Sequence, residues 1–331
     1  MPRWLRWTGR LVAGLVLLIV LAVAVVYVLS SLAIRKRYDF PDSTVRAATD
    51  SASLAWGRHL VEAIGKCQEC HDADLGGKVL VDAPAFGRLA ATNLTAGRGG
   101  IAGYTDADFE RAIRHGVGRD GRPLVFMPSE AFAPMTDEDL AALIGHLRTF
   151  PPVDRDHQAP RVGPVARALY LAGNFPLLPV EIIDHDGPRP APTPGVTVEY
   201  GRYLATIGGC RSCHGQSLAG DANPDAPAIT VGRLGDWTEE DLFRALREGR
   251  RPDGSVIDPG KMPWVRSGLM TDDETRAVWT YIRSLPPARR GTRPQATRAM
   301  SWATVLVAPR TTTPPAITTS GRSRIARSRP N

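Results

Sequence analysis

The sequence predicts a mainly α-helical protein with an N-terminal transmembrane helix followed by two similar helical domains. Residues 11–34 carry no charge over 24 positions, which is long enough to cross a bilayer with some tilt at about 1.5 Å per residue. Further along the chain, two stretches repeat the same order of motifs, as expected of a duplicated domain. No alternation of strand and helix patterns is present, which argues against a βαβ architecture.

The N-terminal segment, residues 1–37, is predicted to be a retained membrane anchor. A cleaved signal peptide is the competing interpretation, because the sequence Ser-Leu-Ala at 31–33 loosely fits a small-residue cleavage site. The apolar run exceeds the roughly 7 to 15 residues of an ordinary signal core, which favours retention. The flanking charges do not decide the orientation, because three arginines precede the run and three basic residues follow it.

Charge is distributed unevenly along the chain. The formal net charge is +7, yet residues 1–37 hold six basic and no acidic residues, and residues 288–331 hold nine arginines and no acid. Residues 38–287 therefore carry 26 basic against 34 acidic side chains. Because no basic face remains on the predicted domains, we expect no nucleic-acid partner. The tail at 288–331, poor in aromatic residues, is predicted to be disordered.

All the cysteines lie in two copies of the pattern Cys-x-x-Cys-His. The copies consist of Cys67, Cys70 and His71, and of Cys210, Cys213 and His214. This pattern is the attachment signature of c-type haem, in which both thiols bond to the porphyrin and the histidine binds the iron. A four-cysteine zinc site usually pairs its motifs about 15 to 20 residues apart, and a redox dithiol or a disulfide leaves the histidine unexplained. The sequence therefore predicts two covalently bound haem c groups.

Each Cys-x-x-Cys-His motif is part of a longer repeat. A short amphipathic helix precedes it, with Gly57 or Gly201 near its start. A second helix follows at 104–116 or 237–249, and both copies have an N-cap threonine and a closing glycine. A loop and a last helix ending in Pro-Pro complete each copy.

The repeat predicts a domain at 52–152 and another at 199–287. Between them lies a proline-rich connector, residues 153–198. Its many apolar side chains would be costly to leave in water, so we expect an ordered strap that packs on the domains, the membrane or a partner.

A pair of methionines eight residues apart occurs in both domains, as Met127 and Met135 and as Met262 and Met270. Met135 and Met270 directly precede predicted helix N-caps, where an apolar residue packs back on the first turn; Leu140 is the expected partner of Met135. Met127 and Met262 are each followed by proline in a loop, so we expect them to bind the iron opposite the histidines. A plain core role is the alternative.

The order of these motifs resembles class I cytochrome c domains, and in particular the multihaem cytochrome subunits of membrane-bound alcohol, aldehyde and gluconate dehydrogenases. Residues 91–95, Ala-Thr-Asn-Leu-Thr, resemble the segment that such domains place beside the haem. Pro227 resembles the proline whose carbonyl orients the haem-binding imidazole, and Thr92 stands at that place in the first domain. The chain has two haem motifs where some relatives have three, and a basic tail follows.

The resemblance implies electron transfer rather than catalysis by this chain. His/Met coordination would fill both axial positions of the iron and leave no room for a substrate. We expect electrons to pass from a membrane-associated dehydrogenase or respiratory complex to a soluble cytochrome or an oxidase. The alternatives are a dihaem peroxidase-like or other haem enzyme, and a cytochrome subunit of a terminal oxidase.

Haem attachment of this kind takes place on the outer side of the membrane, so the resemblance also implies exported domains on an N-in anchor. The remaining histidines are weak candidates for ligands, because the methionines already account for both irons. His115 falls in the last turn of a predicted helix, where a cation is favoured.

Overall fold

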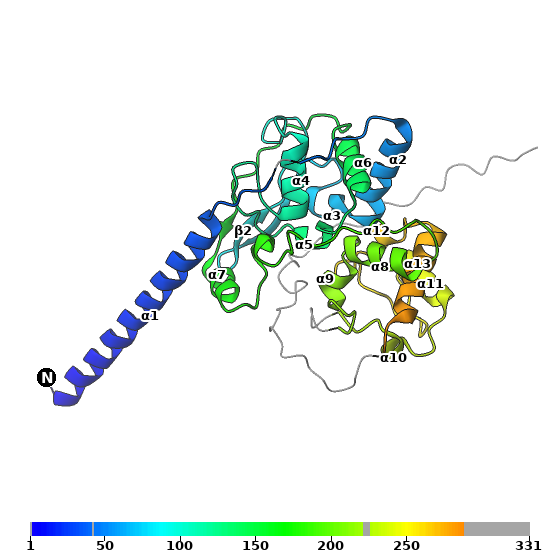
Figure 1. The fold of residues 1–331 in the computed structure, drawn as a ribbon. Helices are drawn as coiled ribbons and strands as arrows, with labels where there is room; N and C mark the ends of the chain where they lie inside the picture. Colours follow the sequence, from blue (N-terminus) through cyan, green and yellow to red (C-terminus); the bar gives the residue numbers. More distant parts are fainter. Residues whose placement is uncertain (1, 42, 221–225, 288–331) are drawn as a thin grey trace, which may run out of the picture.

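Helix α1 (Arg3–Arg35) projects from the body of the computed structural model, with the N-terminus at its far end (Figure 1). The structure describes residues 2–41, 43–220 and 226–287, so the predicted disordered tail at 288–331 lies outside the described residues. Helix α1 is long and apolar enough to cross a membrane, and none of its most apolar 18-residue window is buried inside the protein.

Two groups of helices follow the anchor, and the mainly helical fold is confirmed. The first group consists of α2 (Ser51–His59), which continues as the π-helix η1 (Leu60–Ile64), α3 (Cys67–His71), α4 (Asp106–His115), α5 (Ser129–Phe132) and α6 (Asp137–Leu147). The second consists of α8 (Val198–Ile207), α9 (Cys210–His214), α10 (Val231–Leu234), α11 (Glu239–Arg247), α12 (Trp264–Ser267) and α13 (Asp272–Ser284). Helices α2, α3, α4, α5 and α6 correspond in order to α8, α9, α11, α12 and α13.

The expected helix ends are present in both copies. Thr105 caps α4 and Thr238 caps α11, each with a complete capping box. At the other ends, Gly116 and Gly249 adopt left-handed backbone conformations, with φ of 66° and 64°. A residue with a side chain would be strained there, which explains why a glycine closes both helices.

The first and last helices of each group cross at a glycine. A Cβ atom on Gly57 of α2 would lie 2.0 Å from the carbonyl oxygen of Ala142 in α6, and one on Gly201 of α8 would lie 1.9 Å from that of Ala277 in α13. Only glycine allows the two backbones to approach so closely. The same crossing therefore fixes the framework of both helical groups.

A small antiparallel sheet in the order β1-β2-β3 was not predicted. Its strands are β1 (Val79–Ala83), β2 (Gly87–Ala90) and β3 (Arg161–Val162), so the third strand comes from the connector. Val81 of β1 and Leu89 of β2 point to the buried face of the sheet. Strands of two to five residues leave little periodicity in a sequence, and the β2–β3 pairing joins segments about 70 residues apart.

The connector is ordered, as expected, and contains α7 (Pro164–Leu171) and the 3-10 helix η2 (Pro179–Glu181). Together with the sheet it forms a second hydrophobic core. The buried members of that core are Val81, Leu89, Val117, Val162, Ala166, Phe175, Leu177, Leu178 and Val180. Ala33 and Ile34 at the end of α1 pack against the same core. This contact favours a retained anchor over a cleaved signal peptide.

His115 corrects one expectation from the sequence. Its Nδ1 atom lies 2.9 Å from Nδ1 of His185, and its ring stacks on Phe40 with 4.2 Å between the centroids. Burial lowers the pKa of His115 to about 4, and the neighbouring His185 and Arg189 act in the same direction. The expectation of a favoured cation is wrong, because desolvation and nearby positive groups outweigh the helix dipole.

The burial of His115 beside His185 predicts that the protein loses stability in mild acid. Unfolded histidine takes up a proton near pH 6.5, whereas folded His115 does so only near pH 4. The stability contributed by neutral His115 is therefore fully present above pH 6.5 and falls as the pH drops towards 4. We expect His115→Gln to flatten the pH dependence of the urea unfolding midpoint in this window. An unchanged slope in the variant would contradict the assignment.

Candidate functional site

The two Cys-x-x-Cys-His segments share one backbone conformation. Each forms a single short helix, α3 or α9, and positive φ angles occur at the same four places in both copies. These places are Lys66, Asp72, Leu75 and Gly77 in the first copy and Gly209, Gly215, Leu218 and Gly220 in the second. Positive φ is uncommon for residues other than glycine. Its recurrence at leucine in both copies shows that the whole segment, and not only the Cys-x-x-Cys-His pattern, is repeated.

All four cysteines are free, partly buried thiols. Burial raises the pKa of every one of them, and that of Cys67 to about 12. The thiols remain available for bonding to a porphyrin.

Both motif histidines are held by backbone carbonyl groups. Nδ1 of His71 donates to the carbonyl oxygen of Thr92 at 2.7 Å, and Nδ1 of His214 donates to that of Pro227 at 2.7 Å. The resemblance implied the contact with Pro227 and placed Thr92 at the equivalent position of the first domain. With the proton on Nδ1, the Nε2 atom keeps its lone pair for a metal. Burial lowers the pKa of both imidazoles, so the neutral form needed for ligation prevails at pH 7. The chain therefore fits the cofactor that its motifs indicate.

Met127 and Met262 occupy equivalent positions just before short helices. The prolines that follow them have nearly identical backbone angles, with φ −78° and ψ 55° at Pro128 and φ −78° and ψ 54° at Pro263. Each methionine carbonyl accepts a 2.8 Å hydrogen bond from the amide two residues later. Both side chains are only partly buried. Met127 borders the main hydrophobic core, as Cys67 and Cys210 do, whereas Met262 is not among the residues packed against that core.

Met135 differs from Met127 in being completely buried. It lies in the main core together with Leu140, its expected partner on the first turn of α6. Its carbonyl also accepts a 2.6 Å hydrogen bond from Arg114. Met135 therefore has a structural role, as expected from the sequence.

The role of Arg114 was not predicted from the sequence. Only 1% of its side chain is exposed, and it pairs with Glu110 and Asp137 at 2.6 Å each. The spacing of Glu110 and Arg114 by four residues was visible, but it is equally typical of an exposed helix face. Only the packing of α4 against the start of α6 shows that this arginine joins two helices from within the protein.

The two domains exchange equivalent contacts across their interface. His59 of α2 lies 2.8 Å from a carboxylate oxygen of Glu274 in α13, and Tyr203 of α8 donates to Asp139 in α6. His59 and Tyr203 occupy the same position in the repeat, two residues after the crossing glycine, and the two acids are both third in their helices. The interface is therefore reciprocal, and one hydrophobic core runs through both domains.

Lys66 joins the two attachment segments directly. Its ammonium group donates to the carbonyl oxygens of Ile64 at 2.9 Å and of Gly208 at 2.6 Å. Gly208 stands two residues before Cys210, and Lys66 immediately precedes Cys67. Burial lowers the pKa of this lysine. A single side chain thus links the start of both motifs.

We expect Lys66→Met to weaken the contact between the domains. The variant keeps most of the aliphatic chain but leaves the carbonyl of Gly208 without this donor, a loss of about 1 to 3 kcal/mol in the free energy of unfolding. Urea unfolding of the full chain measures the loss. Lys261→Met, at an exposed lysine, is the matched control. Equal effects of the two substitutions would show that Lys66 does not couple the segments.

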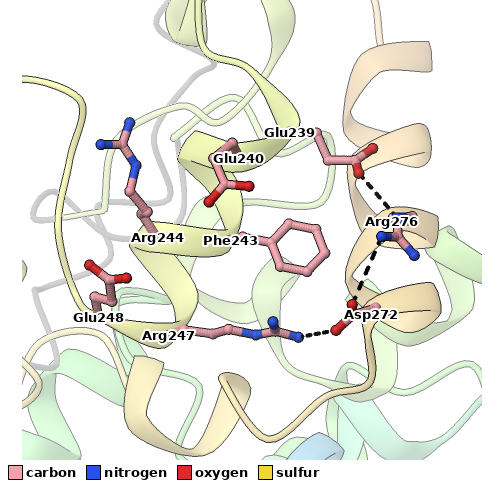
Figure 2. Close-up of a pocket in the computed structure, with 8 residues that line it drawn as sticks. All are labelled: Glu239, Glu240, Phe243, Arg244, Arg247, Glu248, Asp272 and Arg276. Carbon is pink, nitrogen blue, oxygen red and sulfur yellow. Dashed lines mark hydrogen bonds and ion pairs between the residues drawn. The ribbon is translucent and has the colours of Figure 1, made fainter.

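A surface groove on the second domain is separate from these motifs. It has a volume of about 260 Å³ and lies between α11 and α13 (Figure 2). Arg247 pairs with Asp272 at 2.6 Å and Arg276 with Glu239 at 3.1 Å, while the ring of Phe243 lies beneath the guanidinium of Arg247. Since neighbouring acids already neutralise these arginines, the groove presents no cluster of unpaired cations to an anionic ligand.

Comparison with known proteins agrees with the geometry. The family model described as "Cytochrome C oxidase, cbb3-type, subunit III" matches residues 198–282. The alcohol dehydrogenase (quinone) cytochrome c subunit of Gluconacetobacter polyoxogenes is 31% identical over 273 residues, which cover 72% of this chain and 57% of the relative. The gluconate 2-dehydrogenase cytochrome c subunit of Pantoea cypripedii is 29% identical, with coverages of 71% and 60%.

A third relative is nearer to this chain in length. The diheme cytochrome c-type protein of Cereibacter sphaeroides is 28% identical over 252 residues, covering 67% of this chain and 82% of the relative. The chain spans only about three fifths of the two dehydrogenase subunits. Residues 198–282 thus form a cytochrome c domain, whose cofactor is haem c with its iron, and the chain is a homologue of dehydrogenase cytochrome c subunits.

Proposed function

We propose that this protein is a membrane-anchored electron-transfer subunit that relays single electrons through two covalently attached haem c groups, one in each domain. The observation that carries the proposal is the duplicated attachment segment, with its motif histidine held by a backbone carbonyl in both copies. Haem c supplies one-electron chemistry at its iron. The chain contributes the residues that hold the two haem groups and shield them from water.

In this proposal each attachment segment supplies two thiols and one imidazole. The residues concerned are Cys67, Cys70 and His71 in the first domain and Cys210, Cys213 and His214 in the second. The carbonyl groups of Thr92 and Pro227 fix the tautomer and the ring orientation. Met127 and Met262 are the proposed second iron ligands. A thioether ligand in that position raises the reduction potential.

The interface between the domains supports a relay rather than two independent carriers. Lys66 ties the first attachment segment to the carbonyl of Gly208, next to the second. The reciprocal contacts of His59 and Tyr203 fix the domains at two further points. Because all three contacts involve side chains packed at the interface, the fold sets the relative position of the two segments.

The partners are proposed from the relatives and from charge. Relatives whose names specify a dehydrogenase point to a membrane-associated dehydrogenase as the electron donor, and a soluble cytochrome or an oxidase is the proposed acceptor. The excess of acidic side chains in residues 38–287 would attract a basic partner at low salt. With α1 as the anchor, we place both domains on the outer face of the cytoplasmic membrane.

Affinity purification of the full chain from membranes tests this function. We expect two covalent haems per chain, low-spin spectra for both, and a copurifying dehydrogenase. Replacing Cys210 and Cys213 together with serine should halve the covalent haem content and leave the first haem in place.

The same experiment discriminates the alternatives. A resting high-spin haem with an open coordination position would favour a peroxidase-like enzyme, and a copurifying oxidase would favour a terminal oxidase subunit. The absence of covalent haem would refute the proposal.

A further inference from the structure

We propose that helix α7 of the connector is a membrane-contact helix that seats the haem domains on the outer bilayer surface beside α1. This inference rests on α1 spanning a membrane and goes beyond the proposed electron transfer. It assigns to a segment between the two haem motifs the role of orienting the domains relative to the lipid.

The exposed side of α7 and of the residue after it is entirely apolar. Its members are Pro164, Val165, Ala168, Leu171 and Ala172, of which Val165 is 39% and Leu171 40% exposed. Their spacing of three or four residues places them along one face of the helix. A helix that presents an uncharged face to solvent is typical of a contact with lipid or protein.

The position of α7 against α1 favours lipid as the occupant. The two helices lie side by side at the point where α1 enters the body of the protein (Figure 1). Arg167, the one charged residue of α7, donates to Ser30 at 2.7 Å and to Ser31 at 3.0 Å. Its guanidinium also lies over the ring of Tyr27, 4.7 Å from the centroid. The apolar face of α7 is thus held next to the membrane-spanning helix.

The Arg167 contacts also indicate how deep α1 sits. A guanidinium is costly in the hydrocarbon core, so the level of Tyr27 to Ser31 belongs to the headgroup region. The hydrocarbon-spanning part of α1 then runs from near Trp7 to Tyr27, with the guanidinium of Arg10 reaching back over the ring of Trp7 to the headgroup level. At 1.5 Å per residue these 20 steps cover about 30 Å, the thickness of the hydrocarbon core. This registration places tryptophan and tyrosine at the two interfaces, where aromatic residues are preferred.

This span lies closer to the N-terminus than the uncharged run suggests. Residues 28–34 extend the uncharged stretch, but Ser30 is buried in protein contacts and Ala33 and Ile34 pack on the second hydrophobic core. Protein contacts therefore account for Ser30, Ala33 and Ile34. Val28, Leu29 and Leu32 are 50 to 66% exposed and continue the apolar surface of α1 into the headgroup region. As α7 packs beside this part of α1, its exposed face lies at the height of the lipid headgroups.

Depth-dependent fluorescence quenching tests the inference. The full-length, haem-loaded protein is reconstituted in phosphatidylcholine vesicles with single added cysteines labelled with the fluorophore NBD. Emission is compared with and without lipids that carry a nitroxide near the headgroup or deep in the acyl chain; this ratio cancels any quenching by haem. The test sites are Val165→Cys and Leu171→Cys. Leu269→Cys, 51% exposed between α12 and α13 on the second domain, is the matched control.

We expect the labels at 165 and 171 to be quenched several-fold more than the label at 269, and more strongly by the shallow nitroxide than by the deep one. Quenching at 165 and 171 no greater than at 269 would overturn the inference. A label at Leu18→Cys, within α1, tests the premise, because its lack of quenching by the deep nitroxide would refute the anchor and the inference together. Labelling of the unmodified protein would instead reveal free native thiols and count against haem attachment alone.

Discussion

Replacing Met127 with alanine is expected to abolish the Met-ligated, low-spin spectrum of one haem and to leave the other haem unchanged. The alanine cannot provide a thioether, so that iron would lose the second ligand that we propose for it. Its reduction potential should fall markedly, because axial ligands set haem potentials over a range of about 0.8 V. Optical spectra and a redox titration of the purified protein measure both effects. Met262→Ala should do the same to the second haem.

Met135→Ala is the matched control, since it removes a methionine eight residues away on the same chain. Met135 is fully buried, so its truncation should lower the free energy of unfolding by about 2 to 5 kcal/mol while leaving both haem spectra unchanged. If Met127→Ala altered only stability, or if Met135→Ala altered the ligand spectrum, the assigned division of roles would be wrong.

Replacing Gly57 with alanine is expected to prevent normal packing of the first domain. The new Cβ would lie 2.0 Å from the carbonyl oxygen of Ala142, and a backbone atom cannot rotate away as a side chain can. Overpacking of a well-packed core typically costs about 1 to 3 kcal/mol, and we expect a loss at or above the upper end. Gly201→Ala, with a 1.9 Å approach to Ala277, should be equally disruptive in the second domain.

The loss is measured as the free energy of unfolding and as the yield of haem-loaded protein. Gly118→Ala is a suitable control, because its Cβ would meet its nearest neighbour at 3.4 Å, an ordinary contact. Its stability should stay within about 0.5 to 1 kcal/mol of the unmodified protein. Normal stability of Gly57→Ala would show that α2 and α6 cross less closely than the structure indicates.

Local patterns made much of the fold predictable. The caps at Thr105 and Thr238 and the closing glycines Gly116 and Gly249 are confirmed, because a helix end depends on residues within a few positions of it. The hydrogen-bonded carbonyls of Thr92 and Pro227 followed from the resemblance and are present. The ligand roles of Met127 and Met262 and the domain limits stay predictions.

Features that depend on contacts between residues far apart along the chain could not be predicted from the sequence. No residue near His115 along the chain indicates that it contacts His185, which lies 70 positions away. Burial and the neighbouring His185 lower the pKa of His115, so a protonated imidazole is disfavoured at this helix end. The sheet was missed because strands of two to five residues leave little periodicity and because the last strand, Arg161–Val162, comes from the connector. Gly57 was visible in the sequence repeat. The reason for a glycine there becomes clear only from the backbone of α6, which passes too close for a side chain.

Residue patterns were enough to predict the duplicated haem-attachment motifs, the helices around them and an apolar segment long enough for a membrane, because each of these is a pattern within a short window. It took the folded chain to show that Lys66 joins the two motifs, that His59 and Tyr203 make reciprocal contacts, and that Arg167 holds α7 against the end of α1. These contacts form between residues 64 to 215 positions apart. They depend on how complete helices pack, which no local spacing of residues encodes.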